Sequence, residues 1–144
     1  MFISDVLQEK HGQVVKVAPA DTVLSAVKKL AEHKIGAVVV EDDWMRLAGI
    51  FSERDFVNAI DRHGAEALTF PVSRLMSKRV ITCGPRDRVD VALGAMTQGR
   101  IRHLPVVEDG SLIGIVSIGD LVKHRLDEKA LEANVLLDIA RLHA

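Results

Sequence analysis

The pattern of apolar and polar positions repeats along the chain and predicts the same elements twice. Each copy opens with a short β-branched run, 14–17 or 80–83, that ends close to a proline. A segment with helical periodicity follows, and in the first copy its apolar face comprises Val23, Val27, Leu30 and Ala31. Asp21 and Asp87 precede these helices, and we predict that each of them caps its helix.

Two further strands and a second helix complete each copy. The runs 37–40 and 104–107 are too uniformly apolar for strands with one solvated face. The strands 47–52 and 112–117 follow, and Asp109-Gly110 indicates a hairpin turn before the second of them. Each strand then leads into a helix. The predicted order is therefore strand, helix, strand, strand, helix, twice, in a mixed α+β fold.

The two copies are internal repeats with short insertions between matched motifs. Pro19 and Pro85 match at an offset of 66, and the tetrapeptide VVED at 39–42 returns at 106–109. The lead-in segments 3–10 and 72–78 also match. Because neither half is large enough to bury its sheet alone, we expect the repeats to pack about a pseudo-two-fold axis. The expected division is a first repeat at 1–63, a linker at 64–71, a second repeat at 72–127 and a C-terminal helix at 128–144.

Composition and charge narrow the possible partners. The 144 residues are 48% hydrophobic with a formal net charge of −1, so neither a nucleic-acid footprint nor a polybasic membrane patch is indicated. The N-terminal segment holds no apolar run long enough for a signal peptide or a membrane span. Cys83 is the single cysteine, so no internal disulfide can form, and we expect a cytoplasmic protein.

The motif Gly-x-x-Ser-x-x-Asp carries the candidate chemistry. It occurs as Gly49 to Asp55 and again as Gly114 to Asp120. Ser52 and Ser117 stand where a strand becomes a helix, so the backbone N–H groups there favour anions, and an aspartate three residues later can accept both hydroxyls of a ribose. The same spacing is also a capping box, in which the aspartate only turns back onto the serine backbone. The sequence leaves both interpretations open, and the glycines suit either a ligand or another backbone at close range.

Charged residues beside the motifs suggest phosphate contacts. Arg54 lies inside the first motif, and Arg102 and His103 precede a strand of the second copy. Ile118-Gly119 stands where the first copy has Glu53-Arg54, so we expect two unequal sites. We expect three other arginines on a solvated face: Arg79, Arg86 and Arg88.

These repeated motifs, with the stretch RHLPVVEDG at 102–110, resemble a tandem pair of cystathionine-β-synthase-type (CBS) domains over nearly the whole chain. The resemblance implies a regulatory module that binds adenine nucleotides such as AMP, ATP, NAD(H) or S-adenosylmethionine between the copies, and that commonly dimerises into a disc. It also implies an adenine slot lined by Lys16, Val17, Ala18, Ala37, Val38, Thr82, Cys83, Leu104 and Pro105.

The expected function is a non-enzymatic sensor of AMP or NAD(H), acting on a protein that it regulates. We expect a symmetric homodimer in which the second copy covers Trp44 and the apolar stripe of the C-terminal helix. No paired catalytic nucleophile and base, metal-ligand spacing or phosphate-cradling glycine loop is visible, so we assign no catalytic or metal residue. The competing interpretation is a ligand-independent interaction module. In that case the motifs only cap helices, and contacts are made by Trp44 and by a C-terminal stripe that packs on its own core or on a second subunit: Leu131, Val135, Leu136, Ile139 and Leu142.

Overall fold

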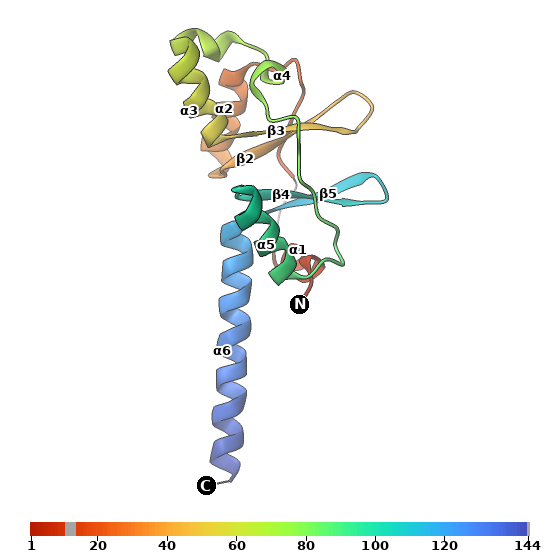
Figure 1. The fold of residues 1–144 in the computed structure, drawn as a ribbon, viewed down its shortest axis with the longest axis vertical. Coiled ribbons are helices and arrows are strands. Elements are labelled where there is room, and N and C mark those ends of the chain that lie inside the picture. The colour runs from red at the N-terminus through yellow and green to blue at the C-terminus, as the bar shows by residue number, and fades with distance from the viewer. Residues whose placement is uncertain (11–13, 144) are drawn as a thin grey trace.

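The computed structural model describes residues 1–10 and 14–143, and the elements follow one another in two similar series (Figure 1). The first series comprises α1 (Ile3–Glu9), β1 (Lys16–Val17), α2 (Val23–His33), β2 (Ala37–Glu41), β3 (Leu47–Ser52) and α3 (Glu53–His63). The short 3-10 helix η1 (Gly64–Thr69) leads into the second, which comprises α4 (Val72–Leu75), α5 (Val89–Gly99), β4 (His103–Glu108), β5 (Ser111–Ser117) and α6 (Ile118–Leu142).

The first repeat folds as predicted around a three-stranded sheet in the order β1-β2-β3. The strand β2 pairs in parallel with β1 and antiparallel with β3. The side chains of Val38, Val39 and Val40 are all fully buried, which explains why this strand lacks alternation. Phe51 of β3 is also fully buried and joins the core beneath α2 and α3.

The second repeat differs at its first strand, where the prediction of a strand over 80–83 was wrong. The strands β4 and β5 pair antiparallel, but only an isolated parallel bridge joins Cys83 to Val106. In the first repeat the N–H of Val39 donates to the carbonyl of Val15 at 3.3 Å. In the strand register the position equivalent to Val39 is Pro105, because each pairs with the isoleucine of the next strand, Ile50 or Ile115. Pro105 has no N–H to donate, so the parallel ladder cannot extend there.

The predicted caps of α2 and α5 need correction. Thr22 is the N-cap of α2, and its hydroxyl accepts a hydrogen bond from the N–H of Ser25 at 3.1 Å. The carboxylate of Asp21 instead accepts from the N–H of Ala18, and that of Asp87 from Gly84, both at 2.8 Å. These aspartates therefore shape the turn before each helix, because their short side chains reach backbone N–H groups three residues earlier.

The lead-in helices are exchanged between the repeats. Ile3 and Val6 of α1 are buried in the core of the second repeat, whereas Val72 of α4 is buried in the core of the first. Equivalent backbone hydrogen bonds of 2.7 to 3.0 Å hold the two helices. For α1, the N–H groups of Ile3 and Ser4 donate to the carbonyls of Asp87 and Pro85. For α4, the N–H groups of Val72 and Ser73 donate to the carbonyls of Asp21 and Pro19. This correspondence confirms two repeats packed about a pseudo-two-fold axis.

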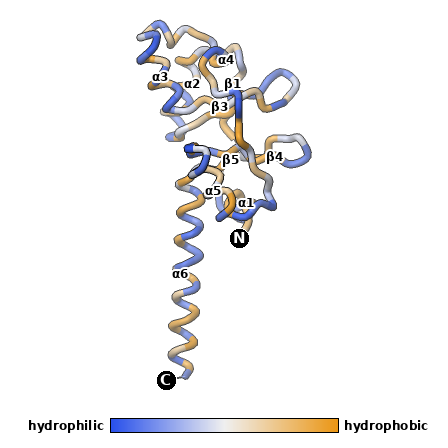
Figure 2. Tube along the Cα trace, viewed as in Figure 1, coloured by the Kyte–Doolittle hydropathy of each residue, from blue (hydrophilic) through white to orange (hydrophobic). Residues whose placement is uncertain are grey.

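The helix α6 begins in the second repeat and continues without a break far beyond it (Figure 1). Leu121 and His124 are buried against the body, whereas Leu131, Leu136 and Leu142 are exposed. Apolar positions recur along the whole projecting part (Figure 2). The C-terminal stripe therefore does not fold back on its own core. Within residues 1–10 and 14–143, no helix has the length and apolar character needed to cross a membrane.

Candidate functional site

Both Ser-x-x-Asp motifs form complete capping boxes. The hydroxyl of Ser52 accepts from the N–H of Asp55 at 3.3 Å, and the carboxylate of Asp55 accepts from the N–H of Ser52 at 2.9 Å. Ser117 and Asp120 make the same two bonds at 3.0 and 2.9 Å. The capping interpretation is therefore confirmed. Each box uses one oxygen of the aspartate, which leaves the second oxygen for another contact.

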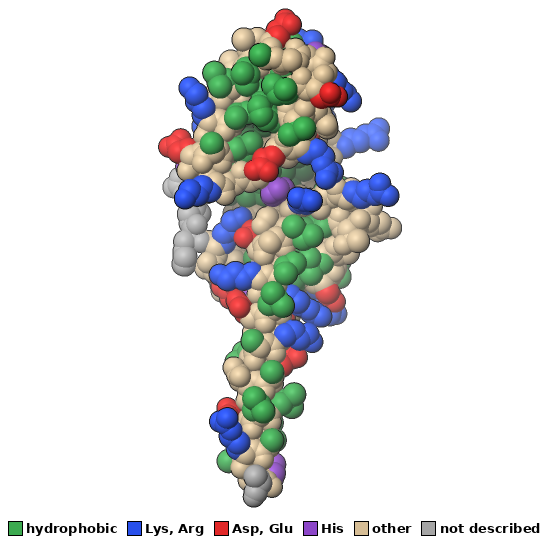
Figure 3. All heavy atoms as spheres, turned by 90° about the vertical axis from the view of Figure 1, so that its left-hand side faces the viewer, with side chains coloured by type: hydrophobic (Ala, Val, Ile, Leu, Met, Phe, Trp, Pro, Cys, Tyr) green, Lys and Arg blue, Asp and Glu red, His purple; other side chains and the backbone are tan. Residues whose placement is uncertain are grey.

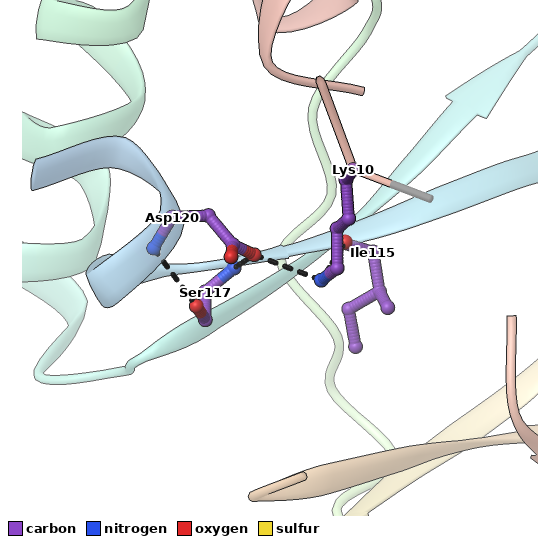
Figure 4. A network of polar contacts seen from close by, with 4 residues as sticks. All are labelled: Lys10, Ile115, Ser117 and Asp120. Carbon is purple, nitrogen blue, oxygen red and sulfur yellow. Dashed lines mark hydrogen bonds and ion pairs between the residues drawn. The ribbon is translucent and has the colours of Figure 1, made fainter. Parts of the chain in front are cut away.

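The further contacts of the two aspartates differ. The Oδ1 atom of Asp55 accepts from the hydroxyl of Ser77 at 3.1 Å. The Oδ2 atom of Asp120 accepts instead from the ammonium of Lys10 at 2.8 Å, and this ammonium also donates to the carbonyl of Ile115 at 2.9 Å (Figure 4). Lys10 directly follows the exchanged helix α1, and Ser77 is the second residue after α4. Each exchanged segment therefore ends against the motif of the repeat that it has joined.

The motif glycines allow this approach of the lead-in segments. A Cβ atom on Gly49 would lie 2.7 Å from the sulfur of Met76 and 2.8 Å from the carbonyl oxygen of Ser77. A Cβ atom on Gly114 would lie 2.7 Å from a terminal methyl of Leu7. Of the two explanations that the sequence left open, the structure shows the close approach of another chain segment.

The first cavity lies between the repeats and is rich in arginine. Its volume is about 350 Å³, and the Ser52 and Asp55 motif of the first repeat faces segments 79–81 and 100–103 of the second. Its charged lining comprises Arg54, Arg79, Arg100, Arg102, Glu53 and Asp55. Four cationic groups against two anionic ones favour an anion, and guanidinium groups match the geometry of phosphate.

The second cavity is the counterpart related by the pseudo-two-fold axis. Its volume is about 390 Å³, and Ser117 and Asp120 face segments 14–15 and 34–37 of the first repeat. Lys10 and Lys34 supply its cationic side chains. Gly36 and His103 line both cavities and so form a shared wall.

The surroundings set the protonation of two groups in these walls. Burial lowers the pKa of His103, and the nearby Lys10 ammonium lowers it further despite the carboxylates of Asp120 and Glu53. The imidazole is therefore mostly neutral at pH 7. Burial alone would raise the pKa of Asp120, but hydrogen bonds from Lys10 and from the Ser117 N–H outweigh burial and lower it. Asp120 is therefore an anion at neutral pH.

The structure brings eight of the sequence-predicted site residues to the cavities. The first cavity receives Ser52, Arg54, Asp55, Arg102 and His103, and the second receives Ala37, Ser117 and Asp120, with His103 shared. The other predicted residues lie outside both linings: Lys16, Val17, Ala18, Val38, Thr82, Cys83, Leu104 and Pro105.

Neither cavity reaches the first-strand residues that the resemblance predicts for an adenine slot. Val17 pairs with Val40 inside the sheet and is buried in the core, so the cavity meets Val14 and Val15 instead, and Val80 and Ile81 in the other repeat. Cys83 is a core residue, and burial raises the pKa of its thiol to about 11, which keeps it protonated and unreactive.

Sequence reasoning missed several residues that line the cavities, namely Lys10, Lys34, Ser77, Arg79 and Arg100. Arg79 was expected on a solvated face; it is exposed, and it also lines the first cavity. The sequence pattern did not show that each motif faces segments of the other repeat, and these segments supply most of the residues that were missed. The matching lead-ins at 3–10 and 72–78 were the available signal, because segments that match in sequence occupy matching places.

Comparisons with known proteins agree with this architecture. The model of the CBS domain family matches residues 3–62 and 72–127. A mitochondrial CBS domain-containing protein of Arabidopsis thaliana is 37% identical over 146 residues, which covers 92% of this chain and 71% of that protein. A crystal structure of a CBS-domain containing protein from Agrobacterium tumefaciens has 46% identity and a TM-score of 0.83, with 86% of this chain and 92% of that chain covered. A CBS domain protein of Pyrobaculum aerophilum complexed with AMP has 27% identity and a TM-score of 0.75, with 83% and 89% covered.

Proposed function

This chain belongs to the CBS domain family, and from that premise we propose that it is a regulatory module that binds an adenine nucleotide between its repeats. The observation that carries the proposal is the first cavity. There the start of α3, with Ser52 and Asp55, faces a cluster of arginines contributed largely by the other repeat. A carboxylate suited to a ribose and guanidinium groups suited to phosphate thus face one space.

AMP is the first ligand that we propose, with NAD(H) as the second. A volume of about 350 Å³ lies at the lower end of the range of roughly 300–1,000 Å³ for small-molecule sites, which favours a mononucleotide. A dinucleotide would have to extend past the wall of Gly36 and His103 that the two cavities share. The AMP complex of the Pyrobaculum aerophilum relative supports this choice.

The test of this proposal is a thermal-shift panel of AMP, ADP, ATP, NAD, NADH and S-adenosylmethionine. A nucleotide at about 100 times its dissociation constant stabilises the folded state by roughly 2.7 kcal/mol. For a chain of this size we expect the melting temperature to rise by about 5–10 °C. A panel without any shift, together with calorimetry that detects no binding, would contradict the proposal.

The variant Asp55→Ala separates ribose binding from helix capping. We expect it to lower the melting temperature without ligand, because the bond from the Ser52 N–H to the Asp55 carboxylate is lost, and the negative charge in the first turn of α3 with it, at a cost of about 0.3–1 kcal/mol. It should also erase half or more of the shift that the nucleotide produces, because the charge-assisted bonds to the ribose contribute about 1.5–3 kcal/mol. Asp61→Ala in the same helix is the control, since Asp61 is exposed and lies outside both cavities.

The competing function is a ligand-independent interaction module, and one observation favours it. Both capping boxes are complete without any ligand, so the motifs have a structural role in any case. If Asp55→Ala keeps the full nucleotide shift of the parent chain and only melts lower, the interaction module becomes the better account. A catalytic role would instead require turnover of a nucleotide above background. We propose a regulatory role in the cytoplasm, exerted on a partner protein.

We also propose that the module acts as a homodimer through its helices. Figure 3 shows hydrophobic side chains gathered over the helices of both repeats and along α6. Leu24 and Val57 are exposed on α2 and α3 of the first repeat, and Val91, Val122 and Leu126 are exposed on α5 and α6 of the second. A symmetric partner would cover corresponding surfaces on both chains.

We expect Val122→Asp combined with Leu126→Asp to convert the dimer into a monomer at high micromolar concentration, as measured by light scattering. The reason is that two carboxylates would be buried without partners in the interface. Trp44 is 77% exposed, but it lies in the turn between β2 and β3, which projects away from the helical side (Figure 1). Trp44→Ala is therefore the control and should stay dimeric. A parent chain that is monomeric with and without nucleotide would remove this proposal.

A further inference from the structure

The ammonium group of Lys10 occupies the place where a ligand of the second cavity would meet Asp120. It lies 2.8 Å from Oδ2 of Asp120 and 2.9 Å from the carbonyl oxygen of Ile115 (Figure 4). Lys10, Ile115 and Asp120 all line this cavity. The side chain of Asp120 is only 29% exposed, so the ion pair is partly shielded from water and stronger than an open surface pair.

This contact takes up capacity that a ribose would need. The same Oδ2 atom also accepts the N–H of Ser117 at 2.9 Å as part of the capping box. A diol binds a carboxylate best through both oxygens. Oδ2 of each aspartate has two donors, but one of those on Asp120 is the charged ammonium of Lys10, whereas both of those on Asp55 are neutral groups of Ser52. A nucleotide that uses Asp120 in this way must therefore first displace the ammonium of Lys10.

The first cavity offers a matched contrast. Asp55 there accepts from the hydroxyls of Ser77 and Ser52, both at 3.1 Å. Hydroxyl groups are neutral and can rotate to serve a ligand, so they compete weakly for the carboxylate. Across residues 1–10 and 14–143, the structure contains no ion pair to Asp55. The two carboxylates thus stand in equivalent positions with different neighbours.

We propose that Lys10 is a built-in competitor for the second cavity, so that a nucleotide fills the first cavity and enters the second only when this side chain moves away. This rests on the proposed nucleotide binding. Lys10 also ends α1, and its backbone N–H donates to the carbonyl of Val6 at 3.1 Å. Because Val6 is buried in the second core, the backbone stays in place while the long side chain is free to rotate. Lys10 is therefore the specificity-determining residue that distinguishes the two sites.

The test uses Lys10→Met, which keeps the length of the side chain and removes its charge. Calorimetry with AMP should show one strong binding event for each parent chain and a second event in the variant. If the ammonium holds Asp120 about nine-tenths of the time, its removal tightens the second site by about tenfold. In an Asp55→Ala background the gain should remain, because only the first cavity is damaged. Lys10→Arg should behave like the parent chain, and Lys129→Met on α6 is the control for loss of a paired lysine.

Adenosine and a titration of Asp120 complete the test. If Lys10 is a competitor, both adenosine and AMP should bind the second cavity more tightly in Lys10→Met. Weaker binding of AMP alone would instead make Lys10 a phosphate partner and overturn the proposal, as would the lack of a second binding event. Carboxyl-carbon NMR should show a higher pKa for Asp120 in Lys10→Met, since Lys10 helps to lower it. This readout needs no ligand, so it tests the ion pair even if nucleotide binding itself fails.

Discussion

Replacing Arg79 and Arg102 together by alanine is expected to weaken AMP binding at the first cavity by about 100-fold. A hydrogen bond to a charged group contributes about 1.5–3 kcal/mol, so the loss of two such bonds to phosphate costs at least about 3 kcal/mol of binding free energy. Both side chains line the cavity and are exposed at its mouth. We therefore expect the melting temperature without ligand to change little, because no core contact is lost.

The control for this experiment is Arg86→Ala combined with Arg125→Ala. These arginines are exposed and lie outside both cavities, so the control changes the net charge by the same amount. Calorimetry at two salt concentrations would separate local contacts from long-range attraction. An equal loss of affinity in both double variants would show that only overall charge matters, and the arginine cluster would lose its assigned role.

Replacing Gly49 by valine is expected to destabilise the fold by about 3 kcal/mol, at the upper end of the cost of overpacking. Valine favours a strand by its own propensity, so the loss must come from packing. The added carbon atoms would meet the backbone oxygen of Ser77 and the side chain of Met76. The carbonyl of Ser77 accepts the N–H of Ile50 at 3.0 Å, so it cannot move away without breaking that bond.

The matched variant is Gly114→Val in the second repeat. The three atoms nearest to a Cβ at this position all belong to the flexible side chain of Leu7, which can turn aside. We expect a cost of about 1 kcal/mol, at the lower end of the same range. Chemical denaturation of both variants measures the difference directly. Equal losses of unfolding free energy would show that side-chain relaxation does not distinguish the close contacts at Gly49 and Gly114.

The elements of the fold could be predicted because local patterns determine them. The spacing of Val23 and Leu30 fixes a helix face, and Asp109-Gly110 fixes a hairpin in which both residues have positive φ, +51° and +79°. The absence of a first strand in the second repeat was harder to foresee. The first strand forms only if the neighbouring strand can donate an N–H group to it, and Pro105 has no N–H. The apolar pattern of segment 80–83 does not show which residue of the neighbouring strand lies opposite it. The division of the chain into repeats, linker and C-terminal helix stays a prediction.

The site could be predicted only in part, because it is made between segments that are distant in sequence. Ser52, Asp55, Ser117 and Asp120 carry a local motif and were found. Lys10 carries no motif and lies in the cavity only because α1 crosses to the other repeat. The short apolar faces of α1 and α4 fit either core equally well on sequence grounds, so periodicity alone does not show which core each helix joins.

The exchange of α1 and α4 relates this tandem chain to a domain-swapped dimer. Two separate copies of one repeat, each lending its lead-in helix to the other, would build the same pair of cores. Such an assembly would form only at a sufficient protein concentration. In the present chain the residues between α3 and α4 join the two partners covalently, which replaces that concentration by a fixed local one on the order of millimolar. The geometry of both cavities is thereby independent of how much protein is present.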